Sequence, residues 1–427
     1  MASKTNEETL AVIRENLAEV LNPEIIEAVL AEGRAPRIYW GTATTGRPHC
    51  GYFPAAIKIA QLLSAGCSVT ILLADIHGFL DNLKAPLELV DHRATYYRFV
   101  IQAILRAVGT PIDKLKFVLG SSYQKSPEYI MDVYKMAALV SENDAKKAGA
   151  EVVKQTTNAP LSGLIYPILQ VLDEQHLDVD AQMGGMDQRK LFVAATEWLP
   201  KLGYKVVSDP LSASPGTVKQ FPRTFEPLLT HTSQRAHLIS PMIAGLNGSK
   251  MSSSDEQSKI DLLDPPDVVS KKVKKAECVP KQPEGNGVLA LIEHVLLPAS
   301  ALKGKREIIV PRHEAEPLVY SDIEKVKADY AADILTPQLI KPVVAKGLND
   351  LMASIIAEYE ASEEWKAVTL KAYPPPVSNK KVKKPKDKGS RHPGAGNTNS
   401  QAQPEGTNAD RVVPLVEASE TPKDGGA

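Results

Sequence analysis

The sequence predicts an α/β protein in which a doubly wound parallel sheet is covered by helices and followed by a smaller α-helical domain. First, short apolar runs alternate with segments of helical periodicity from Arg37 to Leu199. Second, runs such as Ser68–Asp75 (SVTILLAD) are almost uniformly apolar, as expected of strands buried on both faces. Third, strand signals fade after Asp264 while helical patterns continue. Alternation of this kind is typical of parallel sheets covered by helices.

Each element is expected from its own stretch of sequence. Residues 5–33 carry apolar residues at helical spacing and are expected to be helical. The further expected strands are Arg37–Thr42, Leu115–Leu119 and Val179–Gly184. The further expected helices are Gly51–Ala65, Leu89–Val108, Pro127–Val140, Pro160–His176 and Asp187–Leu199. The order of these elements indicates a Rossmann-like domain.

The chain is expected to divide into four segments: an N-terminal helical segment (1–34), the Rossmann-like domain (35–263), a helical domain (264–373) and a tail (374–427). Residues 205–235 are rich in proline and hydroxyl side chains, which predicts a surface insertion. Helices are expected in the third segment at Gly287–Leu297, Tyr320–Ala332 and Pro337–Ala372.

The tail has low complexity and holds six lysines and one aspartate between Lys380 and Lys388. Such a composition cannot bury enough apolar surface to order itself. It is interpreted either as a solubilising tail or as an electrostatic contact to RNA.

Charge is balanced, with 50 basic and 51 acidic residues, so any basic surface must be local. The three cysteines show neither metal spacing nor an obvious pairing, which suits a reducing compartment. No apolar run reaches the length of a membrane span, and the N-terminus MASKTNEETL resembles neither a signal nor a transit peptide. We expect a soluble cytoplasmic protein without a membrane contact.

Two segments far apart in the chain are interpreted as halves of one nucleotide site. In Pro48–Tyr52 (PHCGY) a strand turns into a helix, whose N-terminal N–H groups and dipole attract phosphate. His49 can donate to a phosphate oxygen there. Gly248–Ser254 (GSKMSSS) offers Lys250 and three hydroxyls on a loop, and a lysine can neutralise developing phosphate charge. Either segment alone is also compatible with an ordinary turn or surface loop.

A third constellation lies on the expected helix Pro160–His176. Tyr166, Gln170 and Asp173 are spaced i, i+4 and i+7, so they share one helix face. Buried polar groups need partners, which either a bound amino acid or an internal polar network would supply.

Together these segments resemble the HIGH and KMSKS motifs of class I aminoacyl-tRNA synthetases, and the residues between them resemble tyrosyl-tRNA synthetases of the archaeal and eukaryotic cytoplasmic type. The resemblance covers about residues 5–372 apart from the insertion. It rests on Tyr39, PHCGY, the Tyr166/Gln170/Asp173 helix, Gly185-Met186-Asp187-Gln188, and SKMSSS followed by Lys259–Leu263.

The resemblance implies a tyrosine–tRNA ligase that forms tyrosyl-adenylate from tyrosine and ATP and then charges tRNA-Tyr. It implies a tyrosine pocket formed by Tyr39, Tyr166, Gln170, Asp173 and Gln188. It implies ATP contacts from Thr44, Gly46, His49, Gly51, Tyr52, Gly185, Asp187 and Lys250, with catalysis by His49, Lys250, Ser252, Ser253 and Ser254. ATP would act as a substrate with Mg²⁺, with no resident metal and no tightly bound cofactor. The helical domain would bind the anticodon, and the protein would be a homodimer.

The chain departs from the family pattern at several positions. Tyr52 replaces the last histidine of HIGH, and Ser253 replaces the second lysine of KMSKS, for which a monovalent cation or an additional Mg²⁺ is a candidate substitute. Leu339 stands where relatives carry an anticodon-reading aspartate, so no anticodon-reading residue is assigned. The run Lys271–Lys275 is compatible with a solvated helix face, an RNA contact or a nuclear-import patch with a nuclear pool of the protein.

Three alternatives stay open at this point. They are a tryptophanyl-tRNA synthetase, a small-molecule nucleotidyltransferase with a HIGH-type site, and a non-catalytic RNA-binding or signalling protein on a synthetase scaffold. The pair Tyr39 and Asp173 favours a phenol over an indole. The helical domain and the KMSSS loop argue against the second alternative, and the complete tyrosine set argues against the third.

Overall fold

A computed structural model describes residues 5–81, 86–153, 160–203, 234–246 and 259–375. The described residues belong to one compact unit. The Lys250 loop, almost all of the 205–235 insertion and all but the first two residues of the tail lie outside the described residues, so the expectations for them stay predictions.

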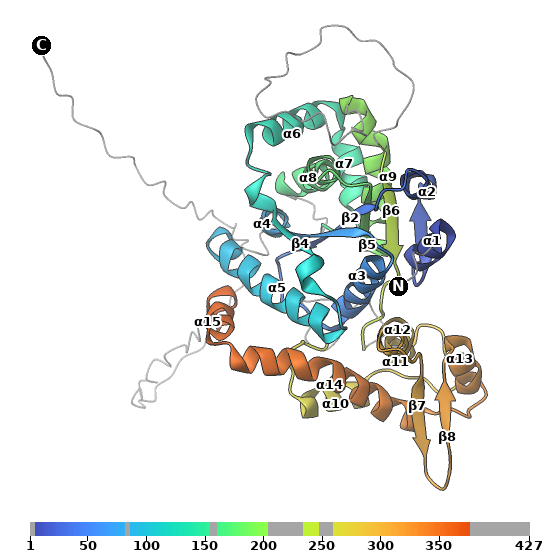
Figure 1. Cartoon of the computed structure of the whole chain (residues 1–427). Coiled ribbons are helices and arrows are strands. Elements are labelled where there is room, and N and C mark those ends of the chain that lie inside the picture. Colours follow the sequence, from blue (N-terminus) through green and yellow to red (C-terminus); the bar gives the residue numbers. More distant parts are fainter. Residues whose placement is uncertain (1–4, 82–85, 154–159, 204–233, 247–258, 376–427) are drawn as a thin grey trace, which may run out of the picture. The chain divides into compact units, whose positions relative to one another are not determined.

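The described part of the chain contains a six-stranded sheet in the order β1-β6-β5-β2-β3-β4 (Figure 1). The strands are β1 (Glu19–Leu21), β2 (Arg37–Ala43), β3 (Ser68–Ala74), β4 (Lys116–Leu119), β5 (Ala181–Gly185) and β6 (Ala236–Ser240). All neighbours are parallel except β1, which pairs antiparallel with β6. The strand order reverses between β2 and β5, because the chain runs outward from β2 to β4 and then returns to β5. The predicted doubly wound α/β fold is confirmed.

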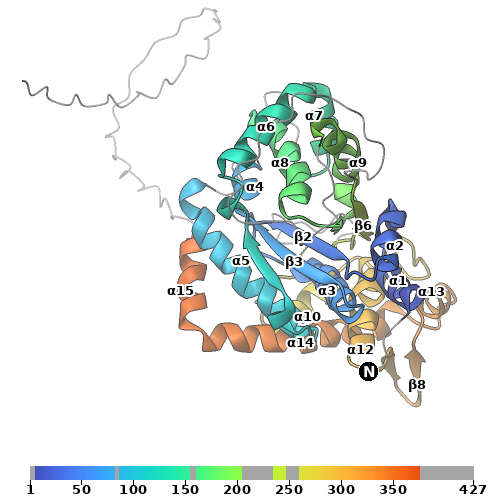
Figure 2. The same ribbon diagram turned by 45° about the horizontal axis from the view of Figure 1, so that its top comes forward.

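Helices cover both faces of this sheet. They are α1 (Asn6–Arg14), α2 (Pro23–Ala31), α3 (Phe53–Ser64), α4 (Asp75–Leu80), α5 (Leu87–Ala107), α6 (Pro127–Leu139), α7 (Glu142–Gly149), α8 (Ser162–His176) and α9 (Arg189–Trp198). Figures 1 and 2 show α3 and α5 on one side of the sheet and α6, α8 and α9 on the other. The expected helices Gly51–Ala65, Leu89–Val108, Pro127–Val140, Pro160–His176 and Asp187–Leu199 are therefore present with small shifts at their ends.

The N-terminal expectation was wrong in one respect. Residues 5–33 are not helical throughout, because β1 separates α1 from α2. Asn16 and Asn22 adopt positive φ angles of 57° and 50° at the two breaks, a conformation that asparagine tolerates better than most residues. Val20 then pairs with Leu238 on β6. Pairing with the sheet edge overrides the local helical pattern.

The segment after residue 264 contains α10 (Pro266–Lys275), α11 (Gly287–Leu291), a π-helical turn (Ile292–Leu296), α12 (Leu297–Leu302), α13 (Ile323–Ala331), α14 (Pro337–Ala361) and α15 (Glu363–Ala372). It also contains an unpredicted hairpin of β7 (Ile308–Arg312) and β8 (Ala315–Tyr320). The expected helix Tyr320–Ala332 therefore begins only at Ile323. The expected helix Pro337–Ala372 is broken at Ser362, whose hydroxyl accepts from the Trp365 N–H and caps α15.

One apolar core joins this helical segment to the sheet. Its buried side chains come from α3 and α5 as well as from α10 to α15. Phe99 of α5 stacks on Trp365 of α15 with ring centroids 5.6 Å apart. None of the described helices is both long and apolar enough to span a bilayer.

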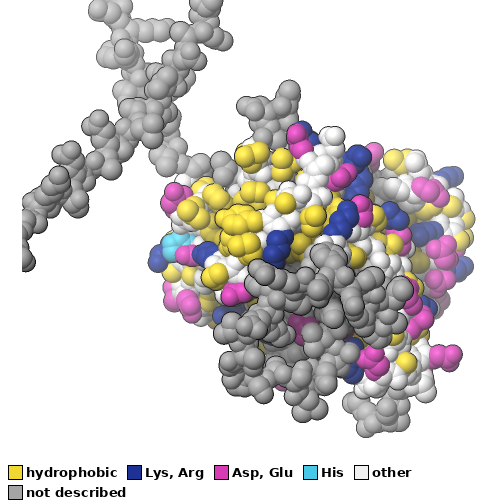
Figure 3. All heavy atoms as spheres, turned by 90° about the horizontal axis from the view of Figure 1, so that it is seen from above, with side chains coloured by type: hydrophobic (Ala, Val, Ile, Leu, Met, Phe, Trp, Pro, Cys, Tyr) yellow, Lys and Arg dark blue, Asp and Glu magenta, His cyan; other side chains and the backbone are white. Residues whose placement is uncertain are grey.

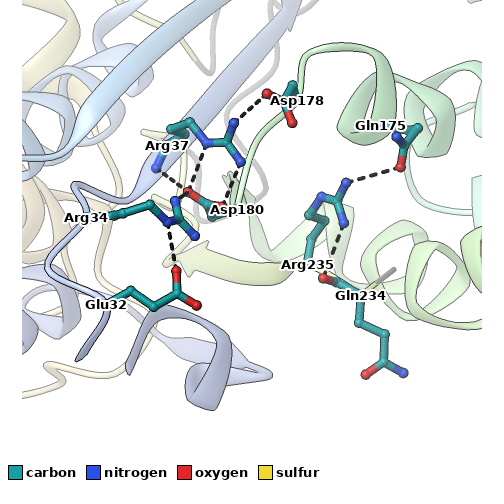
Figure 4. A network of polar contacts seen from close by, with 8 residues as sticks. All are labelled: Glu32, Arg34, Arg37, Gln175, Asp178, Asp180, Gln234 and Arg235. Carbon is teal, nitrogen blue, oxygen red and sulfur yellow. Dashed lines mark hydrogen bonds and ion pairs between the residues drawn. The ribbon is translucent and has the colours of Figure 1, made fainter. Parts of the chain in front are cut away.

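A polar network ties the amino ends of β2 and β5 together (Figure 4). The backbone N–H of Arg37 donates to Asp180 Oδ2 at 2.8 Å, and its Nη2 donates to Oδ1 at 3.0 Å. Arg37 also pairs with Asp178. These contacts serve the end of the sheet away from the ligand edge, since ligands of doubly wound folds bind at the carboxyl ends of the strands.

Candidate active site

A cavity of about 360 Å³ opens at the carboxyl ends of the parallel strands. It is lined by β2 from Tyr39 to Ala43, by the ends of β3 and β5, by α8, and by the residues that follow β6. This position is the one that the doubly wound topology predicts for a ligand site.

The cavity gathers most of the residues predicted from the sequence. All five residues of the expected tyrosine pocket line it: Tyr39, Tyr166, Gln170, Asp173 and Gln188. Five residues of the expected ATP set line it as well: His49, Gly51, Tyr52, Gly185 and Asp187. Lys250, Ser252, Ser253 and Ser254 lie outside the described residues.

Thr44 and Gly46 are not brought to the cavity wall. Thr44 is fully buried against Gly78, where a Cβ would lie 3.0 Å from the Thr44 hydroxyl. The Gly46 carbonyl accepts hydrogen bonds from two tyrosine hydroxyls of the protein. Both residues shape the loop before His49, so a direct ATP contact from them stays a prediction.

Asp173 is the most deeply buried acid of the cavity, with an exposed fraction of 0%. Its Oδ1 accepts from the Tyr123 hydroxyl at 2.7 Å, the Gln124 amide at 2.8 Å and the Tyr129 hydroxyl at 2.9 Å. Its Oδ2 has no hydrogen-bond partner among the described residues. Burial raises the pKa of this carboxyl to about 7, although the three donors act in the opposite direction. The free oxygen can accept a hydrogen bond from a hydroxyl that enters the cavity.

His77 was missed by the sequence analysis. It lines the cavity, with Nε2 3.8 Å from Asp173 Oδ2 and its ring edge-on to Tyr166 at 4.7 Å between centroids. Burial lowers its pKa to about 3, so the imidazole is neutral at pH 7.

The donors to Asp173 were missed as well. Tyr123 and Gln124 follow the carboxyl end of β4, as His77 follows that of β3. Polar residues directly after parallel strands are a usable signal for a ligand edge. Tyr129 gives no such signal, since it lies inside α6.

Gln170 and Gln188 meet across the cavity, because the Gln170 amide donates to Gln188 Oε1 at 2.7 Å. Gly184 makes this approach feasible. A Cβ at this position would lie 2.9 Å from the Gln188 Cγ and 2.7 Å from the Phe192 ring. A side chain at residue 184 would therefore displace Gln188 from the strand end.

His49 begins the 3₁₀ turn Cys50–Tyr52 that leads into α3. Its Nδ1 accepts from the Gly51 N–H at 3.2 Å, which places the ring proton on Nε2. Burial and the nearby Lys259 charge lower its pKa to about 4. His49 is therefore a neutral donor at pH 7.

The PHCGY segment lies beside Ile260 and Asp261, which follow the Lys250 loop in the sequence. The Cys50 N–H donates to the Ile260 carbonyl at 2.9 Å, and His49 forms a β-bridge with Asp261. On the other side of the Lys250 loop, Ser240 to Ile243 line the same cavity. The residues before the Lys250 loop thus line the cavity, and those after it contact the His49 motif.

Comparisons with known proteins agree with this geometry. The family model described as class I tRNA synthetases (W and Y) matches residues 31–353. A cytoplasmic tyrosine–tRNA ligase of Saccharomyces cerevisiae is 48% identical over 92% of this chain and 95% of the yeast protein. The one of Danio rerio is 48% identical over 88% of this chain, which covers 64% of that protein. A crystal structure of tyrosyl-tRNA synthetase from Archaeoglobus fulgidus complexed with L-tyrosine superposes with a TM-score of 0.70 and 33% identity, covering 83% of this chain and 99% of that one.

Proposed function

This chain belongs to the class I tRNA synthetases of the tryptophan and tyrosine group, and we propose that it is a tyrosine–tRNA ligase. It forms tyrosyl-adenylate from tyrosine and ATP and transfers tyrosine to tRNA-Tyr. The observation that supports tyrosine as the amino acid is Asp173, whose Oδ1 is saturated by three donors while Oδ2 awaits one.

The phenol of tyrosine fits this end of the cavity. Its hydroxyl donates to Asp173 Oδ2 and accepts from the Tyr39 hydroxyl, while Tyr166, Gln170 and Gln188 hold the α-amino group. Phenylalanine would leave Asp173 Oδ2 buried without a donor, which is costly. The indole N–H of tryptophan can only donate, so it could not accept from the Tyr39 hydroxyl, which otherwise has only a long contact of 3.5 Å to the Gln170 carbonyl.

ATP binds across the ends of β2 and β5. The positive end of the α3 dipole faces the phosphates, His49 donates from Nε2, and Asp187 accepts from the ribose hydroxyls. Mg²⁺ enters bound to the phosphates, as is usual where it lacks a dedicated cage.

The chemistry proceeds in two transfers without a covalent enzyme intermediate. The tyrosine carboxylate attacks the α-phosphorus of ATP and pyrophosphate leaves. A terminal ribose hydroxyl of the tRNA then attacks the activated carbonyl and AMP leaves. The protein acts by positioning the reactants and by stabilising charge, with His49 and Lys250 on the departing pyrophosphate and Ser252, Ser253 and Ser254 shaping that contact.

Amino-acid-dependent exchange of pyrophosphate into ATP, run with each amino acid separately, tests this proposal. Exchange that depends on tyrosine supports it, while exchange that depends on tryptophan or on no amino acid contradicts it. Lys250→Ala should depress the exchange rate at least tenfold with unchanged tyrosine affinity. A near-normal rate in that variant would remove Lys250 from the site.

The helical segment is proposed to bind the tRNA. A groove of about 750 Å³ lies between α10 and α14 and is lined by Lys274, Lys341 and Lys346. Gln338 also lines it, whereas Leu339 packs against the core. Replacing Lys274 and Lys346 by glutamate should raise the KM for tRNA and leave pyrophosphate exchange unchanged. Equal tRNA affinity would place the tRNA elsewhere.

A homodimer is proposed from an apolar surface on α6 and the start of α8. It comprises Ile130, Met131, Tyr134, Leu139, Leu161 and Ile165, whose exposed fractions range from 37% to 75%. Figure 3, which looks down on the end of the molecule where α6 and α8 lie, shows apolar side chains gathered on that face. A large exposed apolar patch marks an interaction surface. Tyr134→Glu should yield monomers in sedimentation, whereas Val319→Glu on the exposed face of β8 should not. Equal mass for both variants would contradict this interface.

The protein is proposed to act in the cytoplasm, since its yeast and zebrafish relatives are named cytoplasmic. The Lys271–Lys275 run forms the second half of α10, where Val273 is buried and Lys272 pairs with Asp264 at 2.7 Å. These contacts give Lys272 and Val273 structural roles, while Lys274 lines the groove proposed for the tRNA.

A further inference from the structure

The loop at residues 44–48, which leads from β2 to His49, is held by the last residue of the helical segment that precedes the tail. The Tyr373 hydroxyl, directly after α15, donates to the Gly46 carbonyl at 2.9 Å and lies 3.4 Å from the Thr45 carbonyl. A residue from the far end of the described chain thus contacts the backbone of the nucleotide loop.

Two side chains of α5 complete this contact. The Tyr97 hydroxyl donates to the same Gly46 carbonyl at 2.5 Å, and Arg93 Nη1 donates to the Thr45 carbonyl at 2.7 Å. Arg93 Nε also donates to the Ala372 carbonyl at 3.2 Å, at the end of α15. Arg93 therefore connects the nucleotide loop to the C-terminal helix.

The ring of Tyr373 is held as well. The guanidinium of Arg93 lies 5.0 Å from its centroid and that of Arg47, within the loop, lies 5.4 Å from it. Tyr96 meets the ring edge-on at 5.1 Å. Cation–π contacts of this kind favour one ring position. The tyrosine thus contacts both the backbone of the loop and the side chain of Arg47.

These contacts bear on the ATP site because the loop 44–48 contacts the C-terminal helix and also lines the cavity. Thr45 lines the cavity, and its carbonyl accepts hydrogen bonds from Arg93 and Tyr373. His49 follows three residues after Gly46 and also lines the cavity. A displacement of the loop carbonyls would therefore move the phosphate donors, and small misplacements weaken catalysis strongly.

We propose that Tyr373 is a positioning residue for adenylate formation, which holds the loop 44–48 so that His49 Nε2 meets the ATP phosphates. The proposal rests on the ligase function above. It links the end of the helical segment to the nucleotide half of the site and leaves the tyrosine half, on α8, independent of Tyr373.

Full-length Tyr373→Phe and Tyr373→Ala test it in pyrophosphate exchange with ATP varied at saturating tyrosine. Loss of the hydroxyl should lower kcat/KM for ATP about fivefold, and loss of the ring about twentyfold. Tyrosine affinity, measured by calorimetry, should stay unchanged in both. Hydrogen exchange of a peptide spanning residues 43–52 in the ligand-free enzyme should become faster in both, which reports on the loop without activity.

Tyr359→Phe is the matched control, because Tyr359 lies on α14 and packs edge-on against Trp365 at 5.4 Å; it should behave as wild type. The proposal is overturned if Tyr373→Phe shows the kcat/KM for ATP of the wild type and unchanged hydrogen exchange. If Tyr373→Ala fails to fold, the test rests on Tyr373→Phe alone. Equal losses of ATP and tyrosine affinity overturn it too, since they indicate general loosening. Absence of exchange in the wild type would contradict the ligase function instead.

Discussion

Tyrosine binding should weaken as the pH falls from 8 to 6, because the phenol hydroxyl needs an ionised Asp173 as its acceptor. In the ligand-free site burial raises the pKa of this carboxyl to about 7. The hydrogen bond from the ligand stabilises the ionised form, so the pKa in the complex must be lower. Binding therefore releases a proton wherever the free carboxyl is still protonated.

The size of the effect follows from that pKa. At pH 8 about nine-tenths of the free sites are ionised, and at pH 6 about one-tenth are. The dissociation constant for tyrosine should therefore rise about tenfold between pH 8 and pH 6, which corresponds to about 1.4 kcal/mol. His49 and His77, with pKa values of about 4 and about 3, stay neutral over this range and do not contribute.

Isothermal titration calorimetry measures both quantities. Titrations in buffers of different ionisation enthalpy should show release of about half a proton per tyrosine at pH 7. In Asp173→Asn the pH dependence should vanish, although affinity falls. In Tyr123→Phe the carboxylate loses one donor, so the midpoint should move upward by about one pH unit. A constant affinity of the wild type from pH 6 to 8 without proton release would refute this account of Asp173.

Other consequences follow from the same contacts. The melting temperature of ligand-free Asp173→Asn should exceed that of the wild type by a margin that grows from pH 5 to pH 7 and is constant above pH 7. The reason is that the pKa of Asp173 is about 4 in the unfolded chain and about 7 in the folded protein, so the wild type loses stability as the pH rises between these values. A margin independent of pH would contradict the raised pKa. Arg37→Met should lower the free energy of unfolding in urea by about 2 kcal/mol, since the buried Asp180 loses the Arg37 guanidinium and keeps only the backbone N–H of residue 37 and the more distant Arg34. The KM values should not change, because this network lies at the amino ends of the strands; a changed KM for tyrosine would contradict its purely structural role. Gly184→Ala should raise the KM for tyrosine about tenfold and the KM for ATP less, as the new methyl displaces Gln188; unchanged kinetics would mean that Gln188 is not needed.

Local patterns were sufficient to predict β2, β3, β4 and β5 and to place three polar side chains of the cavity on one helix face, whereas β1 and β6 were missed. The near-continuous apolar run at Ser68–Asp75 identified β3, and the helical spacing of Tyr166, Gln170 and Asp173 placed three side chains on one face of α8. Strand and helix periodicities act over a few residues, so they can be recognised without knowing the neighbours of a segment.

The tertiary structure alone decided what surrounds those residues. The donors that saturate Asp173 come from α6 and from the residues after β4, and Tyr373 reaches the loop before His49 from the other end of the described chain. The break between α1 and α2 likewise depends on pairing with β6. Contacts between segments distant in sequence depend on how helices and strands pack against one another. Packing leaves no periodic pattern in the sequence, so such partners cannot be recognised from the sequence alone.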